Sequence, residues 1–420
     1  MQQQSGSSGF PEIRVPALLT FLALLLGFVI GTAFRGQPGF APIQGVAEEL
    51  GSLWLKMLQL TILPLVIGLV VTGISQTLAA AGGGALARRA VLMFVGVLLA
   101  AGTASALLVP LLIELFPIPA AAMAALSGGG TADPGKVPGF AEILEAMVPS
   151  NIFSAAANGA MLPVVIFAAL FALACTRIAE APRRALLTFF EGLAMAMMVI
   201  VGWVLMLAPI GVLGLAVSLG AKTGSDAIGG LAHYILIVSA AGLVVLLASV
   251  GIALTLGRCK PGGFIRSMLP VYAVAISTQS SLASLPAMLG ASRKLGVREA
   301  TADFVLPLAV AIFRGTSPAM NMGVAIYAAY LTGTPLSVWA LGAGVLVAFL
   351  VSLSSVSLPG TLSFVVSVGP IAMAMGVPIE PLALLVAVEM LPDIMRTLGN
   401  VTADVAVTAA VDKRGKAAGA

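Results

Sequence analysis

Long apolar stretches constrain the fold of this chain more than any other feature. A transmembrane helix needs about 20 consecutive, mostly apolar residues. Windows of about 18 or more residues with few charges occur at 15–34, 53–75, 90–113, 152–176, 190–220, 233–257, 264–291, 301–332, 337–376 and 378–411. Hydrophobic residues make up 60% of the chain and charged residues 9%, which is more apolar sequence than one soluble core can use. We therefore predict an all-α polytopic membrane protein, because the strands of a β-barrel would alternate in polarity.

Positively charged residues divide the loops into two classes. Lys and Arg are enriched in cytoplasmic loops. The basic positions that mark one side of the membrane are Arg88, Arg89, Arg177, Arg183, Arg184, Arg258, Lys260, Arg266, Arg293, Lys294, Arg298, Lys413, Arg414 and Lys416. Six helices before residue 258 then place both termini in the cytoplasm, provided that an even number of crossings follows. Because basic clusters flank residues 267–292 on both sides, we predict that this segment enters and leaves the membrane by the same face, as a re-entrant hairpin.

Two Ser-rich turns interrupt the apolar sequence in similar ways. The stretches SSLASLP (280–286) and SSVSLP (354–359) resemble an internal repeat, and the charge pattern places them on opposite faces of the membrane. Non-helical backbone at membrane depth is tolerated only where protein buries it or where it lines an aqueous cavity. Paired, interrupted hydrophobic segments in opposite orientations are typical of secondary transporters with a substrate site near the midplane.

Polar residues form a stripe on the last apolar segment. The stripe consists of Glu389, Asp393, Arg396, Thr397, Asn400 and Asp404. On a helix these positions span an arc of about 100° and about 22 Å of axis, which cannot face lipid. One interpretation is an internal network of ion pairs that ties helices together. The other is a binding site, in which Arg396 suits a carboxylate, Asp393 an ammonium group, and Asn400 with Asp404 a small cation. Pro392 is expected to loosen the helix near the centre of the stripe.

Several motifs resemble the dicarboxylate/amino acid:cation symporters, a family that includes glutamate and aspartate transporters. The resemblance covers nearly the whole chain, and its most specific motif is DIMRTLGNVTAD (393–404). The other motifs are LWLKMLQLTILPLVIGLVVTGIS (53–75), NIFSAAANGAMLPVVIFAALFALA (151–174), APIGV (208–212), QSSLASLP (279–286) and SLPGTLS (357–363). The resemblance implies eight transmembrane helices, two re-entrant hairpins related as inverted repeats, and an elevator-type transporter that assembles as a homotrimer.

The resemblance also implies a division of the chain. We expect a tail with scaffold helices 1 and 2 at 1–80, transport-domain helix 3 at 81–115, and an external loop with scaffold helices 4 and 5 at 116–222. The transport domain continues over 223–412 with its hairpins at 264–292 and 337–376, and a cytoplasmic tail follows at 413–420. The expected location is the cell (inner) membrane.

The family's functional positions carry over onto matching residues. The implied substrate-binding residues are Ser280, Ser281, Thr316, Asp393, Arg396, Thr397 and Asn400, and the implied gate consists of Ser357, Pro359, Gly360 and Thr361. Asp393 is expected to hold the substrate amino group, Arg396 the side-chain carboxylate, and the hairpin tip around Ser280 and Ser281 the α-carboxylate. Asn400 and Asp404 are the expected ligands of a sodium ion, which is the one bound cofactor that the resemblance suggests.

One segment departs from the family pattern. The family's seventh helix carries an Asn-Met-Asp-Gly-Thr signature whose Asn and Asp ligate sodium, whereas this chain has Phe313 and Arg314 before Gly315-Thr316. Residues 93–103 likewise lack the polar side chains expected in the third helix. We predict that at least one sodium site is missing and that the Arg314 guanidinium replaces the ion. Glu389 or Asp404 would then carry protons. In the alternative interpretation, Arg314 only pairs with one of these acids in a weakly active protein.

These observations predict a symporter that imports aspartate or glutamate with Na⁺ and/or H⁺, and a C4-dicarboxylate symporter is the alternative. The expected partners are a small anionic substrate, the bilayer and further copies of the chain, without nucleic acid. We do not expect an enzyme, because Ser280 and Ser281 lack a Gly-x-Ser-x-Gly elbow and His233 is the only histidine. A channel fits a closed stripe of mixed charges less well than a transporter does, and a scaffold or receptor would bind substrate without accumulating it.

Overall fold

The computed structural model describes residues 16–37, 39–120, 123, 126, 147–223, 226–353 and 360–412, and every regular element in these ranges is a helix. The helices are α1 (Ala17–Ala33), α2 (Ala41–Ala81), α3 (Ala85–Leu115), α6 (Ile152–Ala157), α7 (Met161–Cys175), α8 (Glu180–Met206), α9 (Ala208–Thr223), α10 (Asp226–Thr255), α11 (Pro261–Thr278), α12 (Leu285–Lys294), α13 (Glu299–Ile312), α14 (Ser317–Thr332), α15 (Val338–Ser352), α16 (Gly360–Ala374), α17 (Leu382–Leu385), the 3₁₀ turn η1 (Val386–Val388) and α18 (Met390–Val411). The predicted all-α class is therefore confirmed for the described residues.

Four described helices are long and apolar enough to cross a membrane, namely α2, α3, α8 and α10. Shorter apolar helices lie within α1, α7, α9 and α15. Large apolar side chains point outward along α1, where Leu18 and Val29 are 63% and 62% exposed, as expected for a surface that faces lipid. The chain is a multi-pass membrane protein.

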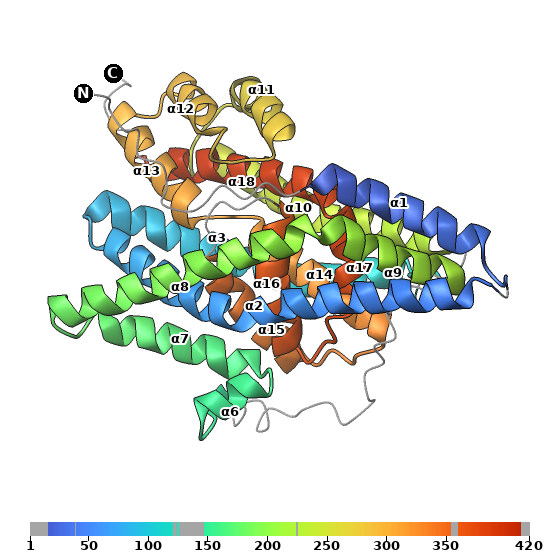
Figure 1. The fold of residues 1–420 in the computed structure, drawn as a ribbon. Helices are drawn as coiled ribbons and strands as arrows, with labels where there is room; N and C mark the ends of the chain where they lie inside the picture. The colour runs from blue at the N-terminus through green and yellow to red at the C-terminus, as the bar shows by residue number, and fades with distance from the viewer. Residues whose placement is uncertain are drawn as a thin grey trace, which may run out of the picture.

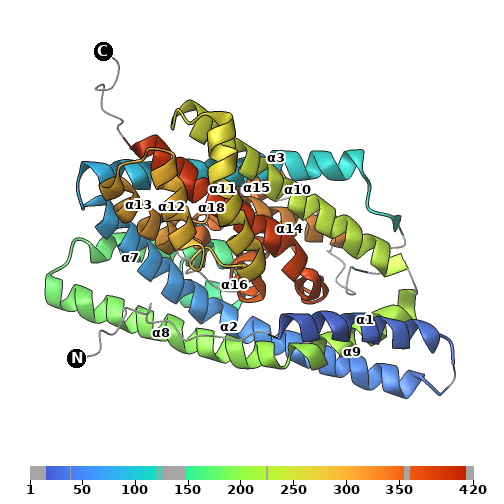
Figure 2. The same cartoon turned by 90° about the horizontal axis from the view of Figure 1, so that it is seen from above.

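The helices pack in two groups that Figures 1 and 2 show from two directions. One group contains α1, α2, α8 and α9, with α7 packed against α2. Its helices approach closely because small residues lie at the contacts: a Cβ atom on Gly31 of α1 would lie 2.2 Å from the Val217 carbonyl oxygen of α9. The other group surrounds α18 and α14, which pack against α3, α10, α11, α15 and α16. This second group holds the polar stripe.

Two pairs of helices correspond to the predicted hairpins. Helices α11 and α12 pack against each other and are joined at 279–284, where Gln279 ends α11 in a left-handed conformation with φ of +49°. Helices α15 and α16 also pack together, and their connection at 354–359 lies outside the described residues. The re-entry of both pairs into the membrane stays a prediction.

Several segments expected as continuous helices are interrupted. The fourth predicted helix is divided into α6 and α7 at Gly159, whose φ of +71° no other residue type adopts easily. The fifth is divided into α8 and α9 just before Pro209, which lacks a backbone donor. The expectation for Pro392 was wrong: α18 begins at Met390, so this proline lies in the first turn, where a missing N–H has little effect on the helix.

The start of α13 is hydrogen-bonded to Asp412, the residue that follows α18. The Asp412 carboxylate accepts hydrogen bonds from the backbone N–H (3.2 Å) and Nε (2.7 Å) of Arg298 and from the Thr301 hydroxyl (2.8 Å). Burial by itself would raise the pKa of Asp412, but these hydrogen bonds outweigh it and hold the pKa below its ordinary value near 3.8. The contact therefore stabilises the fold above about pH 4 and loses its effect as the pH falls through the lowered pKa.

We expect Asp412→Asn to reduce the free energy of unfolding by about 1–2 kcal/mol at pH 7, because the charge-assisted bonds are lost. Thermal unfolding in detergent at pH 7 and at about pH 3 measures the effect. The difference in the free energy of unfolding between wild type and variant should be smaller at the lower pH. An equal difference at both pH values would show that the carboxylate charge does not contribute.

Candidate functional site

The break between α13 and α14 lies directly against α18. At the end of α13, Phe313 has an extended backbone, with φ of −124° and ψ of 110°. The backbone N–H of Thr316 donates to Asn400 Oδ1 (3.0 Å), and its hydroxyl lies 2.6 Å from the same oxygen and 2.9 Å from the carbonyl oxygen of Arg396. The structure thus brings together Thr316, Arg396 and Asn400, three of the predicted substrate-binding residues. Thr316 occupies the Oδ1 atom of Asn400.

A glycine makes this close contact possible. A Cβ atom on Gly399 of α18 would lie 2.1 Å from Cγ2 of Thr316, closer than any real contact. We expect Gly399→Ala to push Thr316 off Asn400, to cost about 1–3 kcal/mol of stability, and to impair substrate binding. The matched control is Gly251→Ala on α10, where a Cβ atom meets nothing within 4 Å. Thermal unfolding and ligand binding in detergent check the prediction, and equal behaviour of the two variants would contradict it.

Arg396 lies at the centre of a buried cluster and is 1% exposed. Its Nη1 atom lies 2.5 Å from Glu389 Oε1 and donates to Asp393 Oδ1 at 2.9 Å. Its Nη2 atom lies 3.5 Å from Oδ1 of Asn321 on α14. The residues in the N-terminal half of the stripe therefore contact one another through Arg396. Nε of the guanidinium has no hydrogen-bond partner among the described residues.

Glu389 connects the cluster to α10. The fully buried hydroxyl of Tyr234 donates to Glu389 Oε2 at 3.0 Å. Next to it on α10, His233 contacts the hydroxyl of Tyr327 (3.1 Å) and the carbonyl oxygen of Phe116 (2.8 Å). The lone histidine thus contacts a tyrosine of α14 and the backbone next to the end of α3.

Asp404 occupies the other end of the stripe. It is 0% exposed, and neither of its oxygens has a hydrogen-bond partner among the described residues. Arg314, which is 8% exposed, interacts electrostatically with Asp404 and with Asp393. Two buried cations, Arg314 and Arg396, thus face three buried acids, so the site carries one surplus negative charge when all five groups are ionised.

An aromatic pair occupies the place where the family pattern has polar side chains. The ring of Phe313 stacks on Phe94 of α3 with a centroid distance of 4.5 Å and an interplanar angle of 10°. Both rings are 1% exposed. This apolar contact joins α3 to the end of α13, the two places where the sequence lacks the ion ligands that the family pattern has.

The other predicted residues lie at the edge of the site or outside the described residues. The hairpin tip reaches the start of α18 through a hydrogen bond from Gln279 Nε2 to the Met390 carbonyl oxygen (3.3 Å), and Ser280 and Ser281 next to it are partly exposed. Ser280 bonds within its own turn. The Thr397 hydroxyl donates to the Asp393 carbonyl oxygen (3.0 Å). Of the predicted gate, Ser357, Pro359 and the side chain of Thr361 lie outside the described residues, and Gly360 begins α16.

Sequence reasoning missed Asn321 and Tyr234. Asn321 lies too far along the chain from Phe313 to belong to the family signature, so the resemblance does not point to it. The available signal was that it is the one amide in the otherwise apolar helix α14. Tyr234 gave little signal, because a tyrosine near the end of an apolar helix is common at membrane interfaces.

Comparisons with known proteins cover nearly the whole chain. The model of the sodium:dicarboxylate symporter family matches residues 17–414. The chain is 28% identical over 389 residues to the proton/sodium-glutamate symport protein of Bacillus caldotenax, covering 91% of this chain and 90% of that protein. It is 25% identical over 386 residues to the proton/glutamate-aspartate symporter of Escherichia coli (strain K12), covering 90% and 88%.

A third relative carries a different substrate name. The chain is 27% identical over 402 residues to the C4-dicarboxylate transport protein 1 of Pseudomonas aeruginosa (strain UCBPP-PA14), covering 93% of this chain and 87% of that protein. The polytopic helical fold, the charged stripe on α18 and the match over nearly the full length agree: the chain belongs to the sodium:dicarboxylate symporter family.

Proposed function

We propose that the protein is a secondary active symporter that imports aspartate or glutamate together with cations. The observation that carries this proposal is the juxtaposition of Arg396 and Asp393, one turn apart and both buried on α18. A guanidinium binds a carboxylate through a planar fork, and a carboxylate binds an ammonium group. An acidic amino acid presents both partners. The names of two relatives, a glutamate and a glutamate-aspartate symporter, support this substrate class.

The charge of the site supports coupling to cations. The five buried ionisable groups already leave one surplus negative charge, and an acidic amino acid brings another. Burying uncompensated charge in a low-dielectric interior costs several kcal/mol per ion. The loaded site therefore needs added positive charge before it can cross the membrane, and protons or sodium ions supply it.

Arg314 bears on the identity of the coupling ion. Its guanidinium interacts with Asp404, the residue that would otherwise complete a sodium site, and the Phe313–Phe94 stack fills the neighbouring space. In our proposal Arg314 acts as a fixed cation, at least one sodium site is lost, and protons drive uptake. Glu389 is the proposed proton carrier, because its buried carboxylate lies 2.5 Å from Nη1 of Arg396 and accepts a hydrogen bond from the neutral Tyr234 hydroxyl.

The remaining parts of the proposal follow the family pattern. The proposal includes a homotrimer of elevator transporters in the inner membrane, with both termini cytoplasmic; the packing of the helices into a group around α2 and a group around α18 supports only the elevator part. Ser280 and Ser281 would receive the α-carboxylate, and Asn400 with Asp404 would hold any sodium ion that remains. The connection at 354–359 with Gly360 and Thr361 would act as the gate.

A C4-dicarboxylate substrate is the second candidate, favoured by the name of the Pseudomonas relative. Uptake of radiolabelled aspartate into proteoliposomes, with competition by glutamate, succinate and fumarate, distinguishes the two. We expect aspartate and glutamate to compete best. Asp393→Ser should reduce aspartate uptake at least about tenfold and spare substrates without an amine, because the ammonium loses a buried ionic partner.

The matched control for Asp393→Ser is Asp303→Ser on α13, because Asp303 has an exposed carboxylate and lies far from the stripe in sequence. This control should leave uptake unchanged. Strong uptake of succinate without uptake of aspartate would favour the second candidate. A wild-type protein that binds substrate but accumulates none would contradict both candidates.

A further inference from the structure

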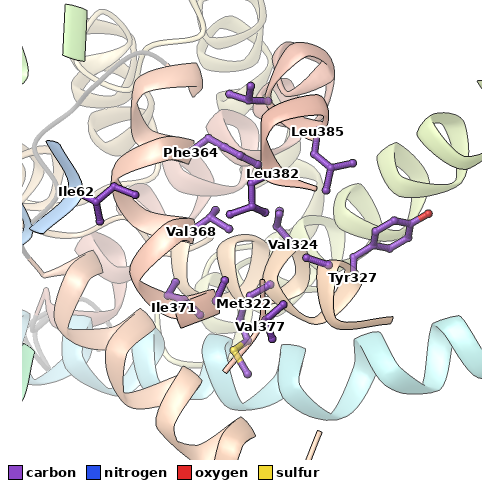
Figure 3. Packing of buried hydrophobic residues seen from close by; sticks show 14 of the residues in the cluster. Ile62, Met322, Val324, Tyr327, Phe364, Val368, Ile371, Val377, Leu382 and Leu385 are labelled. Atoms are coloured by element: carbon purple, nitrogen blue, oxygen red, sulfur yellow. The ribbon is translucent and has the colours of Figure 1, made fainter. Parts of the chain in front are cut away.

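Asn321 on α14 contacts the charged stripe through Arg396. Its neighbours on α14 pack into apolar surroundings: Met320 contacts the region of Gly242 on α10, and Met322 the region of Gly344 on α15. Figure 3 shows Met322, Val324 and Tyr327 of α14 within an apolar cluster that also includes Phe364 and Leu382. Asn321 instead approaches Arg396 on α18 and is 1% exposed.

The chemistry of the guanidinium fixes the orientation of the Asn321 amide. Arg396 can only donate hydrogen bonds, so the oxygen of Asn321 must face Nη2, as observed at 3.5 Å. The Nδ2 group then points away from Arg396 and has no hydrogen-bond partner among the described residues. A buried amide nitrogen without a partner is costly and calls for an explanation.

One edge of the Arg396 guanidinium has no acid partner among the described residues. Both internal acids, Glu389 and Asp393, bind Nη1. Nε has no hydrogen-bond partner among the described residues, and Nη2 makes only the long contact to Asn321. Nε and Nη2 together form a fork that matches the two oxygens of a carboxylate. The Asn321 amide, whose Nδ2 has no hydrogen-bond partner among the described residues, lies beside the Nη2 end of this fork.

We propose that Asn321 is a specificity-determining residue whose Nδ2 group donates to the substrate side-chain carboxylate held by Nε and Nη2 of Arg396. The inference rests on the proposed function and goes beyond it by assigning the binding edge of Arg396 and a residue on α14. A role confined to packing would need only the Asn321 oxygen, which an aspartate also supplies at this position. A role in binding substrate needs the N–H donor, which an aspartate lacks.

Asn321→Asp and Asn321→Leu separate these roles. The readouts are KM and Vmax for aspartate uptake into proteoliposomes, competition by asparagine, and thermal stability in detergent. We expect Asn321→Asp to lower the melting temperature, because it adds a buried acid to a site with surplus negative charge, to raise KM at least about tenfold and to lower the preference for aspartate over asparagine. Asn321→Leu should raise KM by about tenfold with little change in Vmax. Met320→Leu, which changes an apolar contact on the neighbouring face, is the matched control and should keep the wild-type KM.

The two proposals fail in different ways. If the wild-type protein does not accumulate acidic amino acids, the proposed function is wrong. If it does, and both Asn321 variants keep the wild-type KM and substrate preference, the inference about Asn321 is overturned. Should Asn321→Asp fail to fold, Asn321→Leu decides by the same KM and preference measurements.

Discussion

We expect Arg396→Lys to raise the KM for aspartate uptake by about 100-fold, although lysine keeps the positive charge. The Lys ammonium cannot offer the planar fork that Nε and Nη2 of Arg396 present, and a buried bidentate contact contributes about 2–3 kcal/mol. The ammonium keeps the one positive charge beside Glu389 and Asp393, which lie next to Nη1 in the wild type, so the protein should fold. Uptake kinetics in proteoliposomes and thermal unfolding in detergent give the two readouts.

The same substitution at an exposed site serves as the control. Arg184→Lys on α8 changes a surface ion pair with Glu180, in which the side chains are 78% and 62% exposed. It should leave KM unchanged, because exposed ion pairs contribute little. If Arg396→Lys transports aspartate with the wild-type KM, then the stripe on α18 is a structural network and does not bind the substrate carboxylate.

Arg314→Ala should give the second large effect, a fall of about 100-fold in uptake when sodium is absent. Removing Arg314 removes a buried positive charge that interacts electrostatically with the buried Asp404 carboxylate, and uncompensated buried charge costs several kcal/mol. An external cation can then occupy the space. We therefore expect sodium to restore part of the uptake and part of the thermal stability of this variant, while wild-type uptake responds little to sodium.

A double variant tests whether Asp404 is the partner that matters. Arg314→Ala combined with Asp404→Asn removes both charges, so thermal stability in sodium-free buffer should exceed that of Arg314→Ala alone. Non-additivity of this kind is expected for residues that interact directly. If Arg314→Ala transports normally without sodium, the guanidinium is not acting in place of an ion.

Much of the site could be predicted from the sequence because it lies on one regular helix. The 3- and 4-residue spacing from Glu389 to Asp404 fixes which side chains share a face, and the cost of charge in lipid fixes that this face is buried. The structure places Glu389, Asp393, Arg396, Asn400 and Asp404 in the buried interior as that pattern requires. Three points stay predictions: the division of the chain into transport and scaffold units, the gate, and the roles of individual residues.

Contacts between distant segments could not be predicted in the same way. Residues Asn321 and Arg396 come together only because α13 and α14 are separated by an irregular turn, and hydrophobic periodicity does not reveal where a helix is interrupted. The contact between Thr316 and Asn400 depends on the absence of a side chain at Gly399, which is a property of the packing and has no local signature. Family resemblance located Thr316, but it gave no reason to consider Tyr234.

Concentrative uptake of aspartate into sodium-free proteoliposomes tests the central claim most directly. The vesicles contain the wild-type protein, an inward proton gradient is imposed, and labelled aspartate is followed with and without a protonophore. We predict accumulation above the external concentration that collapses when the protonophore is added. Strict dependence of uptake on sodium, with no accumulation under the proton gradient alone, would contradict the proposal that Arg314 replaces a sodium ion and that protons drive transport.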